Sequence, residues 1–188
     1  MLDRLRAAMR EKGVDAMLLT SVTDIAWLTE FTGSSARVLV TADDAVFLTD
    51  GRYAESARGE VRGMPVEIYV TPTTFAEATD ALLKARGVVR CGFQSDRVTV
   101  AALEGLRKAH EGVEWVAVED LTGPLRLVKS PDEIARIRRA CGLADAAFAH
   151  VRGLIMPGMT ELQVALEIEF FFRRQGAGVA FPIISVAG

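Results

Sequence analysis

The amino-acid sequence predicts an α/β fold in which a mixed sheet is flanked by helices. Short apolar runs alternate with amphipathic stretches of helical length over residues 1–125, as in a layered α/β domain. Two of these runs, residues 37–41 and 45–49, are separated only by residues 42–44, Ala-Asp-Asp. This acidic turn predicts a hairpin, so part of the sheet is expected to be antiparallel.

The elements of this first domain follow from the spacing of apolar residues. Leu2, Leu5 and Met9 recur at helical spacing, and Gly13 ends the helix that they predict. The apolar run at 16–20 is typical of a strand covered on both faces. After it we expect a helix at 22–31, the hairpin strands, and a helix that opens at 50–53 and runs through residue 57. Strands and helices then alternate: strands are expected at 66–70, 88–93 and 113–118, and helices at 75–86 and 99–109. No glycine-rich phosphate loop follows these strands, so nucleotide binding is not supported.

A long helix is expected after a break at residues 121–124. Ser130 is its N-cap, Pro131 takes the first helical position and Glu133 the third, which together predict a capping box. The pair Pro157-Gly158 is expected to stop the helix. Apolar residues in steps of three and four predict one buried stripe along it, formed by Ile134, Ile137, Cys141, Ala144, Phe148, Val151 and Ile155.

A second helix and the start of a strand are expected in the last part of the sequence. Thr160 caps this helix, and its inward residues are expected to be Leu162, Leu166 and Phe170. Residues 179–186 alternate weakly and predict a strand without a neighbour to pair with. We therefore expect a complete first domain at 1–125 and the incomplete start of a second domain at 126–188.

Composition excludes several classes of protein. The 188 residues carry a net charge of −3 with no basic block, which argues against a nucleic-acid partner. The first residues form a charged amphipathic segment rather than a signal peptide, and no apolar stretch is long enough to span a membrane. Cys91 and Cys141 stand far apart in apolar surroundings. We expect both to be buried free thiols in a cytoplasmic protein.

The residues alone do not form a complete catalytic constellation. His110 follows a helix and is expected at the surface, as a helix-end histidine. His150 and Asp145 are five positions apart and do not share a helix face, so a metal site with Glu161 is not favoured. A carboxylate pair at positions 167 and 169 is also excluded, because residues two apart point to different sides of a helix. Ser34, Ser35 and Ser185 likewise have no neighbouring base and no nucleophile-elbow context.

Two clusters of residues admit a functional interpretation beside a structural one. The first comprises residues 27–37 and 49–53. In the structural interpretation, Asp50 caps the following helix while Arg52 pairs with a carboxylate and Tyr53 packs. In the functional interpretation, the cluster is a wall presented to a ligand or a partner subunit. The second cluster is the pair Phe181-Pro182, which fits either a core strand or the apolar wall of a substrate pocket.

Four segments give the sequence its resemblance to a known family. Residues 27–34 resemble an aromatic-Leu-Thr-Gly-Phe segment, and residues 48–53 a Thr-Asp-x-Arg-Tyr step. Residues 125–134 resemble an Arg-x-x-Lys-Ser-x-x-Glu-Ile segment. Residues 156–184 resemble a Pro-Gly-x-Thr-Glu…Gly-Ala…Phe-x-x-Ile signature. In this order and spacing, the segments resemble the prolidase, Xaa-Pro aminopeptidase and creatinase family of pita-bread metallopeptidases over essentially the whole sequence.

The resemblance implies a creatinase-type N-terminal α/β domain followed by the first helices and strand of a pita-bread α+β domain. In the family, that second domain holds two divalent metal ions, Mn, Co or Zn, through ligands that lie downstream of the Phe-x-x-Ile segment. The resemblance therefore implies no catalytic residue, no metal ligand and no cofactor within residues 1–188. Phe181 is implied as a substrate-pocket wall.

The resemblance also implies a homodimer built through the N-terminal domain. The candidates for contacts at the dimer interface or at the mouth of the partner's active site are Trp27, Arg37, Arg52 and Tyr53. The expected activity of the full enzyme is hydrolysis of the bond preceding proline, by a dipeptidase or an aminopeptidase acting on proline-containing peptides. Residues 1–188 alone are expected to be inactive. Two alternatives remain open: a non-catalytic dimerisation protein built on the same domain, and a creatinase-like amidinohydrolase.

Overall fold

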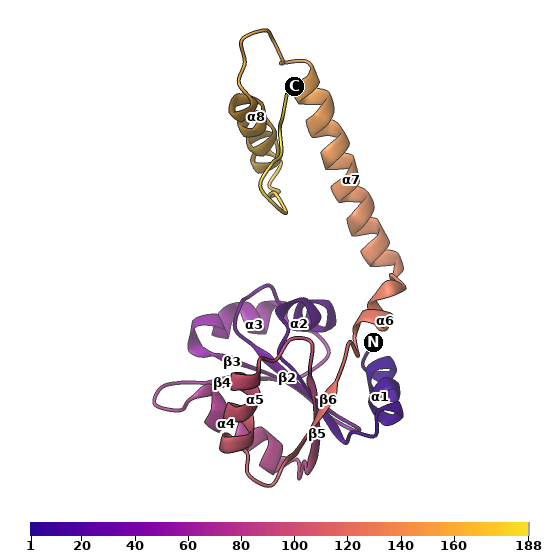
Figure 1. The fold of residues 1–188 in the computed structure, drawn as a ribbon, viewed down its shortest axis with the longest axis vertical. Coiled ribbons are helices and arrows are strands. Elements are labelled where there is room, and N and C mark those ends of the chain that lie inside the picture. Colours follow the sequence, from indigo (N-terminus) through magenta and orange to yellow (C-terminus); the bar gives the residue numbers. More distant parts are fainter. Residues whose placement is uncertain (188) are drawn as a thin grey trace. The chain divides into compact units, whose positions relative to one another are not determined.

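The computed structural model describes residues 1–187, which form two compact units (Figure 1). The first unit is Met1–Val128, and the second begins at Lys129. Each unit has its own secondary structure and is described by itself.

The first unit is built on a six-stranded mixed sheet with the order β4-β3-β2-β1-β5-β6. The antiparallel pairs β1–β2 and β2–β3 include the expected hairpin, whereas β1–β5, β5–β6 and β3–β4 are parallel. The strands are β1 (Ala16–Leu19), β2 (Arg37–Thr41), β3 (Ala45–Asp50), β4 (Val66–Tyr69), β5 (Arg90–Gln94) and β6 (Glu114–Val118).

Helices cover both faces of this sheet (Figure 1). The helices are α1 (Leu2–Glu11), α2 (Val22–Thr29), α3 (Ala54–Glu60), α4 (Phe75–Ala85), α5 (Val100–Ala109) and α6 (Gly123–Leu127), with the 3-10 turn η1 (Gly51–Tyr53). Alternate strand residues face opposite sides. In β1, Met17 packs with α1, α2 and α3, whereas Leu18 packs with α4 and α5. The mixed sheet flanked by helices confirms the predicted fold class.

A buried polar network joins the ends of β1 and β5. Gln94 is the last residue of β5 and is 4% exposed; its side-chain oxygen accepts hydrogen bonds from the backbone N–H groups of Thr20 and Ser21, at 2.8 and 2.9 Å. Its amide nitrogen donates to buried Asp24 at 2.6 Å. Arg126 donates to the other oxygen of Asp24 at 2.9 Å. The network therefore fixes the start of α2 and ties α6 to the sheet.

The second unit contains two capped helices, α7 (Pro131–Arg152) and α8 (Glu161–Arg174). The predicted capping box at Ser130 and Glu133 is present, and Thr160 forms another with Gln163. The prediction that α7 runs to Pro157-Gly158 is wrong: the helix ends at Arg152, and Gly153 is its C-cap.

The expected apolar stripe of α7 is largely exposed. Ile137 is 49% exposed and Phe148 is 66% exposed, whereas Val151 is buried. Within the described part of this unit, α8 is the helix that packs on α7, and it contacts the C-terminal end through Phe171 and His150. The residues of α8 that were expected to face inward are also exposed, because the described part of this unit offers no other surface to cover them. These residues are Leu162, Leu166 and Phe170. Cys141 of α7 is exposed as well, so only Cys91 confirms the prediction of a buried thiol.

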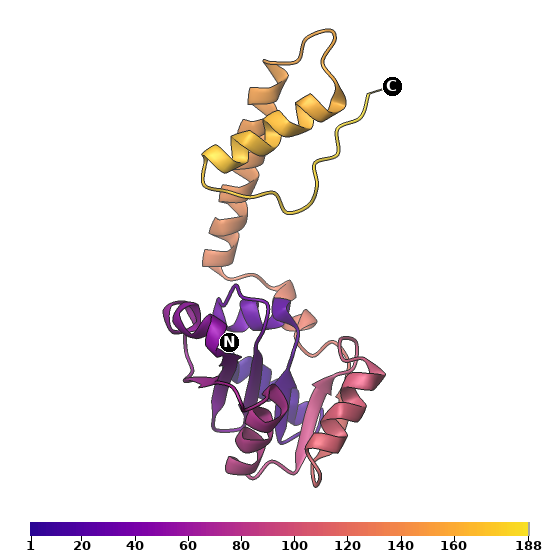
Figure 2. The ribbon, with the colours of Figure 1, turned by 90° about the vertical axis from the view of Figure 1, so that its left-hand side faces the viewer.

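The segment after α8 forms no strand within residues 175–187, contrary to the expectation for 179–186 (Figure 2). A strand is held by hydrogen bonds to a neighbouring strand. The described part of this unit offers none, and the backbone N–H of Ala187 bonds instead to the Glu161 carboxylate at 2.7 Å. Among the described residues, no helix is both long and apolar enough to cross a bilayer.

Removal of the Gln94 side-chain amide is expected to destabilise the first unit. In Gln94→Leu, two backbone N–H groups and the Asp24 carboxylate lose a partner, which should lower the free energy of unfolding by about 2 to 4 kcal/mol. Urea unfolding followed by circular dichroism measures this change. Gln175→Leu is the control, because Gln175 is exposed and its side chain makes no hydrogen bond within residues 1–187. Equal stability of the two variants would contradict the assigned role of Gln94.

Candidate functional site

The carboxyl end of β3 carries a bidentate ion pair between Asp50 and Arg52. The Nε and Nη2 atoms of Arg52 donate to the two carboxylate oxygens of Asp50, both at 2.9 Å. The backbone N–H of Arg52 donates to the same carboxylate at 3.0 Å, so Asp50 also caps η1. The sequence interpretation in which Asp50 caps this turn and Arg52 pairs with a carboxylate is confirmed; the carboxylate is Asp50 itself.

The turn before β2 packs against this ion pair. The Ser35 hydroxyl donates to Asp50 at 3.1 Å, and Ser34 shares a hydrogen bond of 2.8 Å with the Tyr53 hydroxyl. Phe31 meets the Tyr53 ring edge-on, with centroids 5.5 Å apart. A Cβ atom at Gly33 would overlap the Phe31 ring and lie 2.8 Å from Tyr53. The close approach therefore requires glycine at this position.

The ion pair sets the electrostatics of this site. The Arg52 guanidinium holds the pKa of Asp50 at about 2, below its ordinary value of 3.8. The hydrogen bond from Ser34 lowers the pKa of Tyr53. Because the folded-state pKa of Asp50 is depressed, its ionised form stabilises the fold above about pH 4, and this stabilisation is lost as the pH falls toward 2.

Arg52 presents a fixed cation at the surface. Its side chain is 76% exposed, although two of its nitrogens are held by Asp50. It borders a hollow of about 520 Å³ that is lined by Asp50, Gly51, Arg52, Tyr69, Val70 and Thr71. Within residues 1–187, the Nη1 atom of Arg52 has no hydrogen-bond partner and is free to donate to an acceptor on a ligand or a partner subunit.

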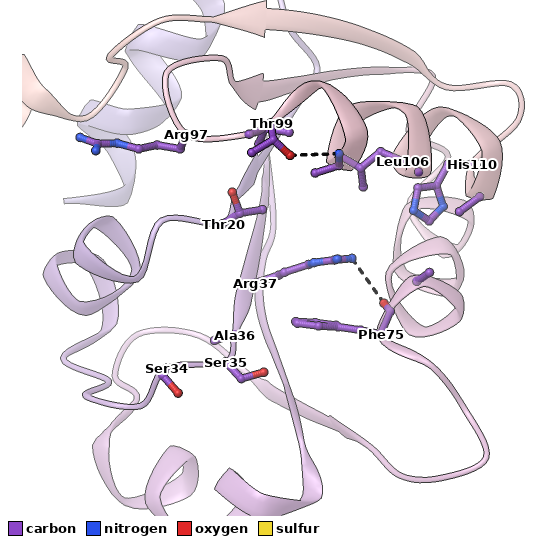
Figure 3. A pocket seen from close by; sticks show the side chains of 15 residues that line it. Thr20, Ser34, Ser35, Ala36, Arg37, Phe75, Arg97, Thr99, Leu106 and His110 are labelled. Carbon is purple, nitrogen blue, oxygen red and sulfur yellow. Dashed lines mark hydrogen bonds between the residues drawn. The ribbon is translucent and has the colours of Figure 1, made fainter.

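Only two of the four predicted contact residues are neighbours. Arg52 lies beside Tyr53, with its guanidinium carbon 5.6 Å from the ring centroid. Trp27 is half-buried and packs against the core on the side of α1, α2 and α3. Arg37 points into a different cleft, between α4 and α5, where its guanidinium lies over the Phe75 ring (Figure 3). In the second unit, Phe181 is 66% exposed and belongs to no strand.

The prediction of a surface position for His110 is wrong. His110 is 1% exposed because it caps the end of α5 on its inner side, facing α4 and β6. Its Nδ1 atom lies 3.2 Å from a carboxylate oxygen of Asp80, and its ring is 5.8 Å from that of Trp115. No local signal in the sequence indicated this burial, because Asp80 lies on the separate amphipathic helix α4, which packs beside α5.

The described residues do not fit a dinuclear metal centre. Within residues 1–187, no three His, Cys, Asp or Glu side chains are grouped so that they could hold a metal ion. His150 lies 4.0 Å from Glu167 and 5.1 Å from the Phe171 ring, so its neighbours are those of a packed helix pair.

Breaking the ion pair is expected to raise the pKa of Asp50. In Arg52→Gln the carboxylate loses its cation and two hydrogen bonds, so its pKa should rise from about 2 toward 3.8. Carbon-detected NMR titration of the Asp50 carboxyl measures this shift. Arg107→Gln, at an exposed position on α5, is the charge-matched control and should leave the value unchanged. An unshifted Asp50 in Arg52→Gln would refute the assigned cause.

Two family models match the chain, one over each of its two units. Residues 1–128 match the Creatinase/Prolidase N-terminal domain, and residues 135–188 match Metallopeptidase family M24. The chain is 35% identical to "Uncharacterized peptidase YqhT" of Bacillus subtilis over 100% of its own length and 53% of the relative. It thus spans about half the length of the curated relatives it matches.

Solved structures show the same correspondence. An Xaa-Pro dipeptidase from Bacillus anthracis superposes with a TM-score of 0.85 at 33% identity, over 93% of this chain and 48% of that one. The N-terminal domain of the cytoplasmic peptidase PepQ from Mycobacterium tuberculosis superposes with a TM-score of 0.60 at 34% identity, over 66% of this chain and 96% of that one. The chain therefore belongs to the creatinase/prolidase family, with an N-terminal domain of that type followed by a segment that matches the M24 metallopeptidases.

Proposed function

We propose that the protein containing this chain is an Xaa-Pro peptidase, a dipeptidase or an aminopeptidase, that hydrolyses the bond preceding proline. The observation that carries the proposal is the order of the two family matches along one chain. Similarity to an Xaa-Pro dipeptidase over 93% of the chain supports it further. The substrates are proline-containing peptides.

The proposed catalysis uses two divalent metal ions, Mn, Co or Zn, bound outside residues 1–187. The match of residues 135–188 to a metallopeptidase family supports a metal-dependent hydrolase. A pair of such ions supplies an activated water for attack on a peptide carbonyl. We assign residues 1–125 to the creatinase-type domain and residues 126–188 to the start of the catalytic domain, with Phe181 as an apolar wall of the substrate pocket.

The proposed assembly is a homodimer formed through the N-terminal domain. The fixed, exposed guanidinium of Arg52 and the neighbouring Tyr53 suit a contact with a partner subunit or with the mouth of its active site. Trp27, which is half-buried, is a further candidate. We also propose a cytoplasmic location, which the two free cysteines support.

The activity is tested with the full-length protein and with the polypeptide of residues 1–188. With Mn²⁺ present, the full-length protein should release the first residue from an Xaa-Pro dipeptide or from an Xaa-Pro-Yaa peptide, and EDTA should abolish this release. The 1–188 polypeptide should show no metal-dependent turnover, because residues 1–187 hold no metal-ligand group. Product release is measured by chromatography.

Matched peptides with alanine in place of proline are the controls for specificity. Comparable turnover of the Xaa-Ala peptides would overturn the assignment to proline. Failure of the full-length protein to cleave any of these peptides with Mn²⁺, Co²⁺ or Zn²⁺ would overturn the peptidase assignment. The dipeptide and the longer peptide together distinguish a dipeptidase from an aminopeptidase.

Reversing the charge of Arg52 is expected to weaken the dimer of the full-length protein. In Arg52→Glu a carboxylate replaces the exposed guanidinium beside Asp50, so the dimer dissociation constant should rise at least about tenfold. Sedimentation equilibrium measures this constant. Arg107→Glu makes the same change on exposed α5 and should leave it unchanged. A dimer unaffected by Arg52→Glu would exclude Arg52 from the interface.

A further inference from the structure

The first unit contains a cleft that the proposed peptidase activity does not use (Figure 3). It has a volume of about 520 Å³ and lies between α4 and α5, near the carboxyl ends of β1 and β5. Ala102, Gly105 and Ala109 line it from one face of α5, at helical spacing. A Cβ atom added at Gly105 would meet nothing within 4 Å. The cleft thus owes its open volume to small side chains, and its size suits a small organic molecule.

Arg37 enters this cleft with its guanidinium fixed in orientation. Its Nη1 atom donates to the Thr79 hydroxyl at 2.6 Å and to the Phe75 carbonyl at 3.4 Å. Its guanidinium carbon lies 4.0 Å from the centroid of the Phe75 ring, a cation–π contact that sets the plane of the group. Figure 3 shows the side chain reaching across the cleft from β2 toward α4.

One edge of this guanidinium remains available. Within residues 1–187, the Nε and Nη2 atoms of Arg37 have no hydrogen-bond partner, and no carboxylate lies within ion-pair distance. Burial lowers the pKa of Arg37, which reflects a cation partly removed from water without an anion beside it. The Nε–Nη2 edge has the geometry that binds a carboxylate through two parallel hydrogen bonds.

The charge of the cleft matches a single negative charge on a ligand. Its lining contains no Asp or Glu. The second arginine in the lining, Arg97, is already paired with Asp96 at 3.1 Å. Buried His110 also contributes to the lining, and its inaccessible Nε2 atom has no hydrogen-bond partner within residues 1–187. Phe75, Leu106 and the alanines supply the apolar remainder of the surface.

We propose that this cleft binds a small organic carboxylate with an apolar body. The carboxylate pairs with the Nε–Nη2 edge of Arg37, and the apolar body lies against Phe75 and the small-residue face of α5. A carboxylate fits better than a phosphate ester, because one unpaired guanidinium balances one negative charge and the rest of the surface is mainly apolar. The site is separate from the surface at Arg52 and needs no metal.

The test uses the full-length protein and N-acetyl-leucine as the probe, with binding followed by the amide NMR shifts of α4 and α5 and by calorimetry. N-acetyl-leucine should bind saturably, and uncharged N-acetyl-leucine amide should bind at least about tenfold more weakly, since the two differ only in the charged group. Inorganic phosphate is the second comparison. Equal binding of the acid and the amide, or binding of phosphate alone, would overturn the carboxylate assignment.

Three variants locate the probe in the cleft. Arg37→Gln should weaken binding at least about tenfold, and Arg107→Gln, the charge-matched control on exposed α5, should stay within about twofold. Ala102→Phe places a ring in the cleft from an exposed helix position and should weaken binding to a similar extent while Arg37 is intact. If Arg37→Gln does not fold, Ala102→Phe decides the question. Binding that is unchanged in Ala102→Phe would refute the site.

Discussion

The structure of the first unit depends on one buried amide, that of Gln94. This side chain continues the pairing of β1 and β5 beyond the ends of the strands, because its oxygen receives the N–H groups of Thr20 and Ser21. Without it, two backbone donors would have no protein partner at the point where the chain leaves the sheet for α2. The same amide holds Asp24, and Asp24 holds Arg126. Three segments far apart in sequence are thereby fixed at one edge of the sheet.

That edge also carries the two surfaces that we interpret as functional. In an α/β sheet, the space beyond the carboxyl ends of the parallel strands is where ligands commonly bind. At one place the chain turns from β3 into α3 through the Asp50–Arg52 pair, which leaves a fixed cation at the surface. At another, Arg37 starts β2 and extends between α4 and α5. The two arginines therefore differ in their surroundings: Arg52 is held by the Asp50 carboxylate, and Arg37 has no carboxylate partner within residues 1–187.

Much of the first unit could be predicted from the sequence because its elements are local. The apolar run at Ala16–Leu19 and the hairpin of β2 and β3 each depend on neighbouring residues, and each is found as expected; in the second unit the same holds for the cap at Ser130. Contacts between distant segments could not be predicted in this way. The burial of His110 depends on Asp80 of another helix, and the orientation of Arg37 depends on Phe75 and Thr79. In the second unit, periodicity predicted buried faces for α7 and α8, but burial also requires a partner surface, and the described residues provide one only near Val151.

The role of the Gln94 amide is tested most directly by native-state hydrogen exchange at the backbone N–H groups of Thr20 and Ser21. Both residues lie beyond the last residue of β1 and are partly exposed, so strand pairing alone does not protect them. If the Gln94 amide holds this edge of the sheet, both N–H groups should exchange as slowly as that of Leu18 within the strand, through global unfolding. Exchange at the rate of an exposed loop would show that the amide does not hold the two segments, and would contradict the account.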